Sequence, residues 1–341
     1  MSASSPIRVG VIGTGGMGTR HAQNFARYVG GATLAGVFDV DGPRAARVAA
    51  EGGGAVVFPT PEALIADDGV DAVLIAAPDE LHAGLVRTCL AAGKPVLCEK
   101  PLATSVADAT ALVDAEVAIG RRLIAVGYMR RFDPAHLAVK AAADSGEIGA
   151  PVMFKGVHRN AEADYGITPA AVVVNSAGHD LDSARWMTGE EVVSARVFGL
   201  RTRDDLHPVT RDLLLINLVL THGRHAVSEM DVNAGYGYEV SAELVCQAGT
   251  AHTGQADRVI VRGHAHRGVP VAADWLDPFQ EAYVAEIHDW IGSIAGARPF
   301  AGASAWDGLE TALTAAACVE SIATGADVAV VRPPKPALYL G

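Results

Sequence analysis

The segment NSAGHDLD, residues 175–182, combines residue types that can handle a proton. On a helix, Asn175 and His179 share one face one turn apart, so the amide can contact a substrate or the histidine but cannot take a proton. Asp182 lies on the same face and can orient the imidazole, whereas Asp180 points about 100° away. The segment therefore predicts His179 as a general base and Asn175 as a substrate-binding amide, with a packing histidine as the alternative.

A lysine in CEKPLA, residues 98–103, is the second candidate for chemistry. The run PVLCEKP is typical of a buried strand, which puts Glu99 and Lys100 at the carboxyl end where doubly wound sheets bind ligands. Pro101 keeps Lys100 out of helical geometry. A solvated surface lysine is the ordinary alternative, but the position of Lys100 at the ligand-binding edge argues against it.

A glycine-rich run, GTGGMG, directly follows an apolar strand and opens a helix. Gly13 permits a tight turn, Gly15 lets the backbone approach a pyrophosphate, and Gly18 lets helix and strand pack closely. Amide groups at the helix start would face the anion. The run predicts a dinucleotide site formed by Gly13, Thr14, Gly15, Gly16, Met17 and Gly18.

The next strand ends in VFD, which places Asp39 21 residues beyond Gly18. A carboxylate at this distance binds both hydroxyls of the adenosine ribose. It also repels a 2′-phosphate, and no arginine follows Asp39 at once. The sequence therefore predicts NAD rather than NADP as the cofactor.

Strands and helices alternate through residues 1–125, which predicts an NAD-binding domain. The strands are continuously apolar, so the sheet should be buried on both faces, as in a doubly wound parallel α/β fold. From residue 126 to 341 the pattern changes to long strands with polar or glycine-containing connections, which favours an α+β domain with one large, mostly antiparallel sheet. Helices are expected at 176–188, 279–295 and 305–324, and the carboxyl end as an extended tail.

Composition limits the class of partner. The chain has 341 residues, 50% of them hydrophobic, a net charge of -12 and a pI near 5.4. This charge opposes nucleic acid and anionic membranes, so a small molecule or a protein is the expected partner. The amino terminus lacks the features of a targeting segment, and the longest aliphatic run is too short to span a bilayer. A cytoplasmic protein is expected.

Metal binding is not predicted. The four cysteines, Cys89, Cys98, Cys246 and Cys318, form no CxxC pair, which favours buried thiols in a reducing compartment. His264 and His266 alternate as on one strand face, but no cysteine or carboxylate completes a ligand set nearby.

Five motifs together resemble one family, the glucose-fructose oxidoreductases, inositol dehydrogenases and MocA proteins, over nearly the whole chain. They are GTGGMG, AAPDELHAGLV at 76–86, CEKPLA, GYMRRFDP at 127–134 and HDLDSARWMTG at 179–189. GYMRRFDP followed by HRN at 158–160 is most similar to the inositol 2-dehydrogenases. The resemblance implies oxidation of a ring secondary alcohol to a ketone with NAD, and a dimer or tetramer formed through the carboxyl-terminal sheet.

The resemblance also implies roles for particular residues. Along the cofactor it places Ala77, Pro78, His82, Glu99 and Lys100. Around the substrate it places Lys100, Met129, Arg130, Asn160, Asn175, His179 and Tyr283. His82 could instead cap or pack its helix, and Tyr283 could be a core aromatic. The family uses a lysine, an aspartate and, four residues after the aspartate, a histidine as base. Lys100 and His179 match this pattern, which implies that Lys100 binds the reacting hydroxyl and His179 is the base, but Asn175 occupies the position of the aspartate.

Three functions stay open from the sequence. The first is an NAD-dependent dehydrogenase of a polyol or sugar, with an inositol as first candidate and another sugar or the reverse reduction within the same class. The second is an NAD-binding sensor without turnover, for which Asn175 is the argument. The third is an assembly protein that binds no substrate.

Overall fold

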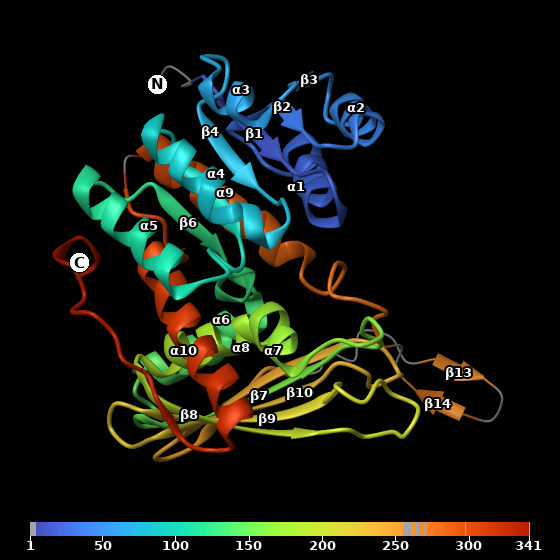
Figure 1. The fold of residues 1–341 in the computed structure, drawn as a ribbon, viewed down its shortest axis with the longest axis vertical. Coiled ribbons are helices and arrows are strands. Elements are labelled where there is room, and N and C mark those ends of the chain that lie inside the picture. The colour runs from blue at the N-terminus through green and yellow to red at the C-terminus, as the bar shows by residue number, and fades with distance from the viewer. Residues whose placement is uncertain (1–4, 255–260, 264–265, 269–270, 297, 341) are drawn as a thin grey trace. The chain divides into compact units, whose positions relative to one another are not determined.

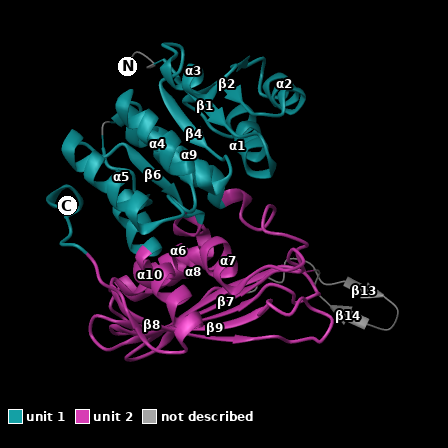
Figure 2. Ribbon diagram, in the orientation of Figure 1, with its two compact units in different colours: residues 1–129, 282–312, 333–341 teal, residues 130–281, 313–332 magenta. Residues whose placement is uncertain are grey.

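The computed structural model describes residues 5–254, 261–263, 266–268, 271–296 and 298–340 (Figure 1). The chain divides into two compact units, which Figure 2 colours separately. Unit 1 comprises Met1–Met129, Ala282–Ala312 and Pro333–Gly341. Unit 2 comprises Arg130–Glu281 and Leu313–Arg332. The first boundary falls close to the predicted residue 125, but unit 2 is not the continuous segment 126–341 expected from the sequence.

Unit 1 is built on a doubly wound parallel sheet, as predicted. Its strand order is β15-β6-β5-β4-β1-β2-β3, and only the short β15 pairs antiparallel. This order corresponds to the arrangement in which ligands bind beyond the carboxyl ends of the strands. The strands are β1 (Ile7–Ile12), β2 (Ala32–Phe38), β3 (Val56–Val57), β4 (Ala72–Ile75), β5 (Val96–Glu99), β6 (Ile124–Gly127) and β15 (Ala303–Ser304).

Local signals set the helices of unit 1. Side chains of Asp41, Thr60 and Ser105 accept hydrogen bonds from backbone amides in the first turns of α2, α3 and α5, which satisfies donors that have no partner within the helix. Gly120, with φ of 73°, ends α5 in the left-handed conformation that glycine adopts without strain. The helices are α1 (Gly16–Arg27), α2 (Gly42–Glu51), α3 (Pro61–Ala66), α4 (Asp79–Ala91) and α5 (Val106–Ile119).

Helix α9 (Gln280–Gly296) explains why unit 1 includes residues from the second half of the chain. Its buried side chains Ile287, Trp290 and Ile291 belong to the same hydrophobic cluster as Val9 and Val11 of β1. Burial of these large side chains against the parallel sheet holds the helix in unit 1. A linear reading of the sequence cannot detect this return of the chain.

Unit 2 contains one large sheet with the order β12-β11-β7-β10-β9-β8-β16. Only β7 and β10 pair in parallel, so the predicted mostly antiparallel sheet is confirmed. Along β9 the residues Leu214, Ile216, Leu218 and Leu220 are buried, which is the alternation of a sheet with one covered face. The strands are β7 (Pro151–Arg159), β8 (Val192–Leu200), β9 (Leu213–Leu220), β10 (His225–Asp231), β11 (Glu239–Cys246), β12 (Thr250–His252) and β16 (Val328–Ala329). A separate pair consists of β13 (Val261–Gly263) and β14 (His266–Gly268).

The helices of this half include one that the sequence analysis missed. Helix α6 (Pro134–Asp144) has Asp133 as its amino-terminal cap and proline at its first position, a signal that was present in the sequence. The helix predicted at 176–188 corresponds to α8 (Gly178–Thr188) and the end of a π-helical turn, η2 (Val173–Ala177). A short helix, α7 (Pro169–Val172), precedes this turn. Helix α10 (Ala305–Thr324) matches its predicted range.

The carboxyl-terminal tail is tied down rather than simply extended. A short 3-10 helix, η3 (Ala337–Tyr339), brings the Tyr339 hydroxyl within 2.5 Å of Glu116 on α5. The other oxygen of Glu116 accepts from the backbone amides of Leu123 and Ile124. The tail therefore closes over a buried carboxylate of unit 1.

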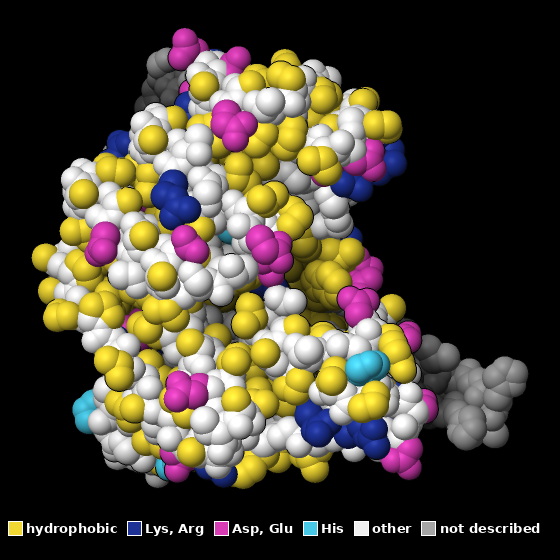
Figure 3. All heavy atoms as spheres, in the orientation of Figure 1, with side chains coloured by type: hydrophobic (Ala, Val, Ile, Leu, Met, Phe, Trp, Pro, Cys, Tyr) yellow, Lys and Arg dark blue, Asp and Glu magenta, His cyan; other side chains and the backbone are white. Residues whose placement is uncertain are grey.

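The surface carries mixed charge. On the face drawn in Figure 3, basic side chains occur in small groups separated by acidic and uncharged ones. Among the helices that the structure describes, none is long and apolar enough to cross a membrane.

Candidate active site

The glycine-rich loop has the geometry that its sequence predicted. Gly13 has φ of 89°, and a Cβ there would lie 2.3 Å from the carbonyl oxygen of Ala76. A Cβ on Gly18 would lie 1.8 Å from the carbonyl oxygen of Gly13, so helix α1 and strand β1 approach too closely for any other residue. At Gly15 a Cβ would meet nothing within 4 Å.

That open space lies at the amino terminus of α1. Gly15 is the cap residue and has no side chain that could accept from the first amides of the helix. Unsatisfied amides with open space before them suit a pyrophosphate. The residues present therefore fit a dinucleotide, which Gly13, Thr14, Gly15, Gly16, Met17 and Gly18 would hold.

Asp39 directly follows β2 and contacts this loop through Thr14. Its Oδ2 accepts from the backbone amide and hydroxyl of Thr14 at 2.6 and 2.9 Å. Burial would raise the pKa of Asp39, but hydrogen bonds from the amides of Asp41 and Thr14 and from Arg44 lower it. The carboxylate is thus ionised at the position predicted to bind the ribose.

Arg44 is a residue of this site that the sequence analysis passed over. It lies five positions after Asp39, in the first turn of α2, and donates to Asp39 Oδ1 at 2.7 Å. The argument for NAD from the absence of a following arginine is therefore weaker than the sequence suggested. The sequence did contain this signal, since Arg44 follows Asp39 by only five residues.

The side chain of His82 on α4 contacts two backbone segments. Its ring nitrogens lie 2.6 Å from the carbonyl oxygen of Pro101 and 2.9 Å from that of Ala77. Both carbonyl groups can only accept, and a neutral imidazole has one N–H, so a neutral ring donates either to the segment after β4 or to the loop after β5. Pro78 caps α4 between them. This arrangement resembles the alternative that His82 packs its helix, and its contact with a cofactor stays a prediction.

Glu99 and Lys100 lie at the carboxyl end of β5, as predicted. Glu99 Oε1 lies 2.7 Å from Nε2 of His21 on α1, and Oε2 accepts from the Lys100 amide at 3.3 Å. Burial would raise the pKa of Glu99, but the hydrogen bond with His21 and the charge of Lys100 lower it. Lys100 is half-buried.

His21 is the second residue that the sequence analysis missed. It is 1% exposed and lies 78 positions from Glu99 in the chain, so no local pattern could have paired them. The ring of Tyr283 on α9 meets the ring of His21 edge to face, with centroids 5.7 Å apart. Tyr283 is buried in unit 1, where it packs on the residue that holds Glu99.

In unit 2, a π-helical turn separates the two residues of the opening segment. Asn175 lies within η2 and is exposed, whereas His179 lies in the first turn of α8 and is 8% exposed. The π turn replaces the α-helical spacing assumed from the sequence. Such turns are frequent at functional sites, because they re-aim side chains within a helix.

Asp182 does not orient His179 as the sequence suggested. It accepts two hydrogen bonds from Arg131, from Nε at 2.9 Å and from Nη2 at 2.6 Å. A paired, parallel arrangement of this kind uses both oxygens of a carboxylate. The structure therefore assigns Asp182 to the anchoring of Arg131.

Asp180, the residue after His179, forms a buried ion pair with Arg130. Asp180 is 1% and Arg130 2% exposed, with Oδ1 and Nη1 3.0 Å apart. His158 on β7 completes the pair, its Nδ1 2.9 Å from Asp180 Oδ2. Burial would raise the pKa of Asp180, but the charge of Arg130 and the hydrogen bond from His158 lower it to about 2. Arg130 is directed at Asp180, and its predicted contact with substrate stays a prediction.

The remaining predicted residues lie in several places. Met129 is buried in η1 (Met129–Phe132), and Asn160 follows β7, its amide donating to the carbonyl oxygen of Asp231 at 2.8 Å. Lys100 belongs to unit 1 and His179 to unit 2. No group of three or more metal-ligating side chains occurs among the described residues, and His264 lies outside them. All four cysteines are buried.

Both halves of the chain match models of one family. Residues 7–128 match the oxidoreductase family with an NAD-binding Rossmann fold, and residues 136–252 match the GFO/IDH/MocA C-terminal domain. The inositol 2-dehydrogenase of Rubrobacter xylanophilus is 46% identical over 98% of this chain and 96% of its own. Inositol 2-dehydrogenase 1 of Saccharopolyspora erythraea is 43% identical over 98% of this chain and 99% of its own.

A solved structure extends the match to the fold. Myo-inositol dehydrogenase from Lactobacillus casei, in complex with NAD(H) and myo-inositol, superposes with a TM-score of 0.93 at 30% identity. The match covers 98% of this chain and 99% of that one. With both halves of the chain matched and relatives aligned over nearly its whole length, this protein belongs to the GFO/IDH/MocA family of oxidoreductases.

Proposed function

We propose that this protein is an NAD-dependent dehydrogenase that oxidises a ring secondary hydroxyl of a cyclic polyol to a ketone, with an inositol as first candidate. The observation that carries the proposal is the 46% identity, over 98% of the chain, to a protein named inositol 2-dehydrogenase. The open glycine loop and the lysine at the carboxyl end of β5 support it, because they fit a cofactor and a polarising cation on one sheet edge.

The chemistry asks for few protein groups. Nicotinamide, when bound, supplies the hydride acceptor. Lys100 binds the reacting hydroxyl and stabilises the alkoxide charge that develops on its oxygen. His179 takes the hydroxyl proton as general base, and the Asn175 amide binds a neighbouring hydroxyl. This division of roles rests on the resemblance and on the residue types.

NAD is proposed over NADP because Asp39 is ionised at the end of β2. A negative charge there repels a 2′-phosphate, while Arg44 reduces that repulsion through its ion pair. We expect NAD to have the higher kcat/KM in the native protein. Asp39→Ser should narrow the difference through weaker NAD binding, and Arg44→Gln should widen it.

The deciding experiment is a screen of NAD reduction with inositols and cyclic sugars. Turnover of at least one inositol, abolished in Lys100→Met but with NAD binding retained, is the expected result. If NAD binds while no polyol or sugar reacts in either direction, the sensor function replaces the enzyme. Equal kcat/KM for NADP would overturn the assignment of the cofactor alone.

We further propose that the uncovered face of the unit 2 sheet carries oligomer contacts. Phe198, Leu200 and Leu215 are 52%, 47% and 39% exposed on β8 and β9. Exposed large apolar side chains on adjacent strands are typical of an interface. Light scattering should show a dimer or tetramer that Leu215→Asp dissociates, and a monomeric native protein would contradict the proposal.

A further inference from the structure

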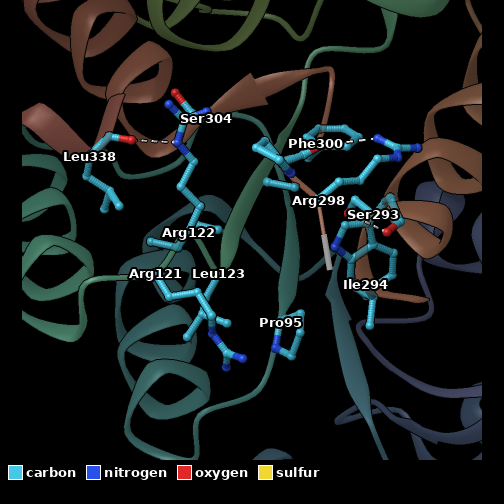
Figure 4. Close-up of a pocket in the computed structure, with 14 residues that line it drawn as sticks. Pro95, Arg121, Arg122, Leu123, Ser293, Ile294, Arg298, Phe300, Ser304 and Leu338 are labelled. Carbon is cyan, nitrogen blue, oxygen red and sulfur yellow. Dashed lines mark hydrogen bonds between the residues drawn. The ribbon is translucent and has the colours of Figure 1, made fainter. Parts of the chain in front are cut away.

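A cavity of about 370 Å³ opens in unit 1, away from all the predicted site residues (Figure 4). Pro95 comes just before β5, and Leu123 just before β6. The cavity is thus at the amino ends of the parallel strands, whereas Gly13 and Lys100 follow the carboxyl ends of β1 and β5. The cavity and the proposed cofactor site therefore lie at opposite ends of the strands of one sheet.

Several segments build the cavity. The residues before β5 and β6 form one side, and the end of α9 with the following loop forms another; Leu338 of the tail adds a third. The lining consists of Pro95, Arg121, Arg122, Leu123, Ile124, Ala125, Trp290, Ser293, Ile294, Arg298, Pro299, Phe300, Ser304 and Leu338.

The charge of this lining is opposite to that of the protein. Three arginines, Arg121, Arg122 and Arg298, line the cavity, and the lining contains no aspartate or glutamate. The whole chain carries a net charge of -12, so an exclusively cationic lining is not what its average composition would produce. Nine of the fourteen lining residues are apolar, among them Trp290 and Phe300.

Of the three arginines, Arg121 has N–H donors left for a ligand. Arg121 donates to the carbonyl oxygen of Gly93 at 3.3 Å and forms no ion pair with a described residue. Arg122 donates to the carbonyl oxygen of Leu338 at 2.9 Å. The Arg121 guanidinium has five N–H donors, more than its contact with Gly93 uses. Arg298 differs, because it also pairs with Asp289 at 2.6 Å.

We propose that this cavity binds a small organic anion, a molecule with an apolar or aromatic body and a carboxylate, sulfonate or phosphate group. Its volume is at the lower end of the range of ligand pockets, about 300–1,000 Å³, which limits the ligand to a small molecule. The apolar walls would take the body, and Arg121 would pair with the anionic group. The site is independent of the proposed function, since no predicted catalytic residue lines it.

The test uses the full chain and two fluorescent probes in the presence of saturating NAD, which keeps them from the cofactor site. Anilinonaphthalene sulfonate is anionic, and phenylnaphthylamine is its uncharged analogue. We expect the anionic probe to bind the native protein and to bind the double variant Arg121→Gln, Arg298→Gln about tenfold more weakly, the scale of two exposed charge pairs. Binding of the uncharged probe should change less than about twofold.

Arg87→Gln is the matched control, because Arg87 is also an exposed, paired arginine of unit 1 but does not line the cavity. Its probe affinity should equal that of the native protein. NAD binding of each variant checks that unit 1 is intact, and Arg121→Gln alone replaces the double variant if that binding is lost. Equal affinity of the anionic probe for native and variant protein, or no binding of that probe in the presence of saturating NAD, would overturn the proposal.

Discussion

Each predicted catalytic residue has an ion-paired carboxylate as its neighbour in the chain. Glu99 precedes Lys100 in unit 1, and Asp180 follows His179 in unit 2. Asp180 pairs with a guanidinium, since Arg130 lies 3.0 Å away. Glu99 pairs instead with an imidazole, 2.7 Å from His21.

The two partners have different consequences for charge. A guanidinium is always charged, so the negative charge of Asp180 is compensated within the fold. His21 Nδ1 is buried without a hydrogen-bond partner among the described residues. An imidazole is charged only when it is protonated, so the pair with His21 does not by itself compensate the charge of Glu99. The charge of Asp180 is therefore compensated within the fold, and we expect the charge of Glu99 to act on Lys100 and a bound cofactor.

The largest effect is expected from breaking the pair in unit 2. Asp180→Ala leaves Arg130 buried without its counter-ion, which should lower the free energy of unfolding by about 3–5 kcal/mol. Denaturation in urea measures this loss, with Asp164→Ala, at an exposed carboxylate, as the control. A loss below about 1 kcal/mol would mean that the pair is not essential to the fold.

Removal of the proposed catalytic groups should act on rate instead of stability. Lys100→Met and His179→Ala should each lower the rate of the chemical step by about a hundredfold or more, the usual scale of a lost general base or charge stabiliser. Single-turnover measurements with the polyol found in the screen separate this step from binding. Near-native rates in His179→Ala would mean that the proton leaves by another route.

The stability of the protein in acid should depend on the pKa of Asp180. The pKa of Asp180 is lowered from 3.8 to about 2, so the stability that it contributes is present above pH 3.8 and is lost as the pH falls through about 2. Asp180→Asn should therefore show a shallower loss of stability between these pH values than the native protein. Identical acid unfolding curves for the two proteins would show that other carboxylates control the transition.

Glu99→Gln tests whether its charge is directed at the cofactor. The oxidised nicotinamide ring is positive and the reduced ring is neutral, so removal of a nearby negative charge should weaken NAD⁺ binding relative to NADH by about tenfold, or 1.4 kcal/mol. Calorimetric titration of both cofactor forms measures the ratio without turnover. Glu62→Gln, at an exposed position on α3, is the control. An equal loss of affinity for both cofactor forms would mean that Glu99, like Asp180, stabilises the fold.

The smallest effect is expected from a charge placed at the π turn. Asn175→Asp adds a carboxylate near the proposed base, which should favour its protonated form and move the acidic limb of the oxidation profile to higher pH. An exposed charge is worth at most about 1 kcal/mol, so the shift should stay below about one pH unit. A pH profile at saturating NAD, with native and variant protein side by side, measures it. An unmoved limb would place Asn175 too far from the base.

The sequence alone determined the elements of the site, because their signals are local. A glycine turn between a strand and a helix, caps such as Thr60 and Ser105, and two distinct strand patterns each occupy a short stretch of chain. The same holds for Lys100, whose position follows from where β5 ends. Helix α6 was detectable on the same grounds from Asp133 and Pro134, and was overlooked.

Only the tertiary structure decided which group each buried charge meets. His21 and Glu99, like Arg130 and Asp180, lie far apart in the sequence, and α9 returns from the second half of the chain to pack Tyr283 on His21. Local spacing on a helix suggested Asp182 as the partner of His179, yet Arg131 takes both of its oxygens. The physical reason is that a buried charge needs the nearest compensating donor in space, and packing of distant segments selects that donor.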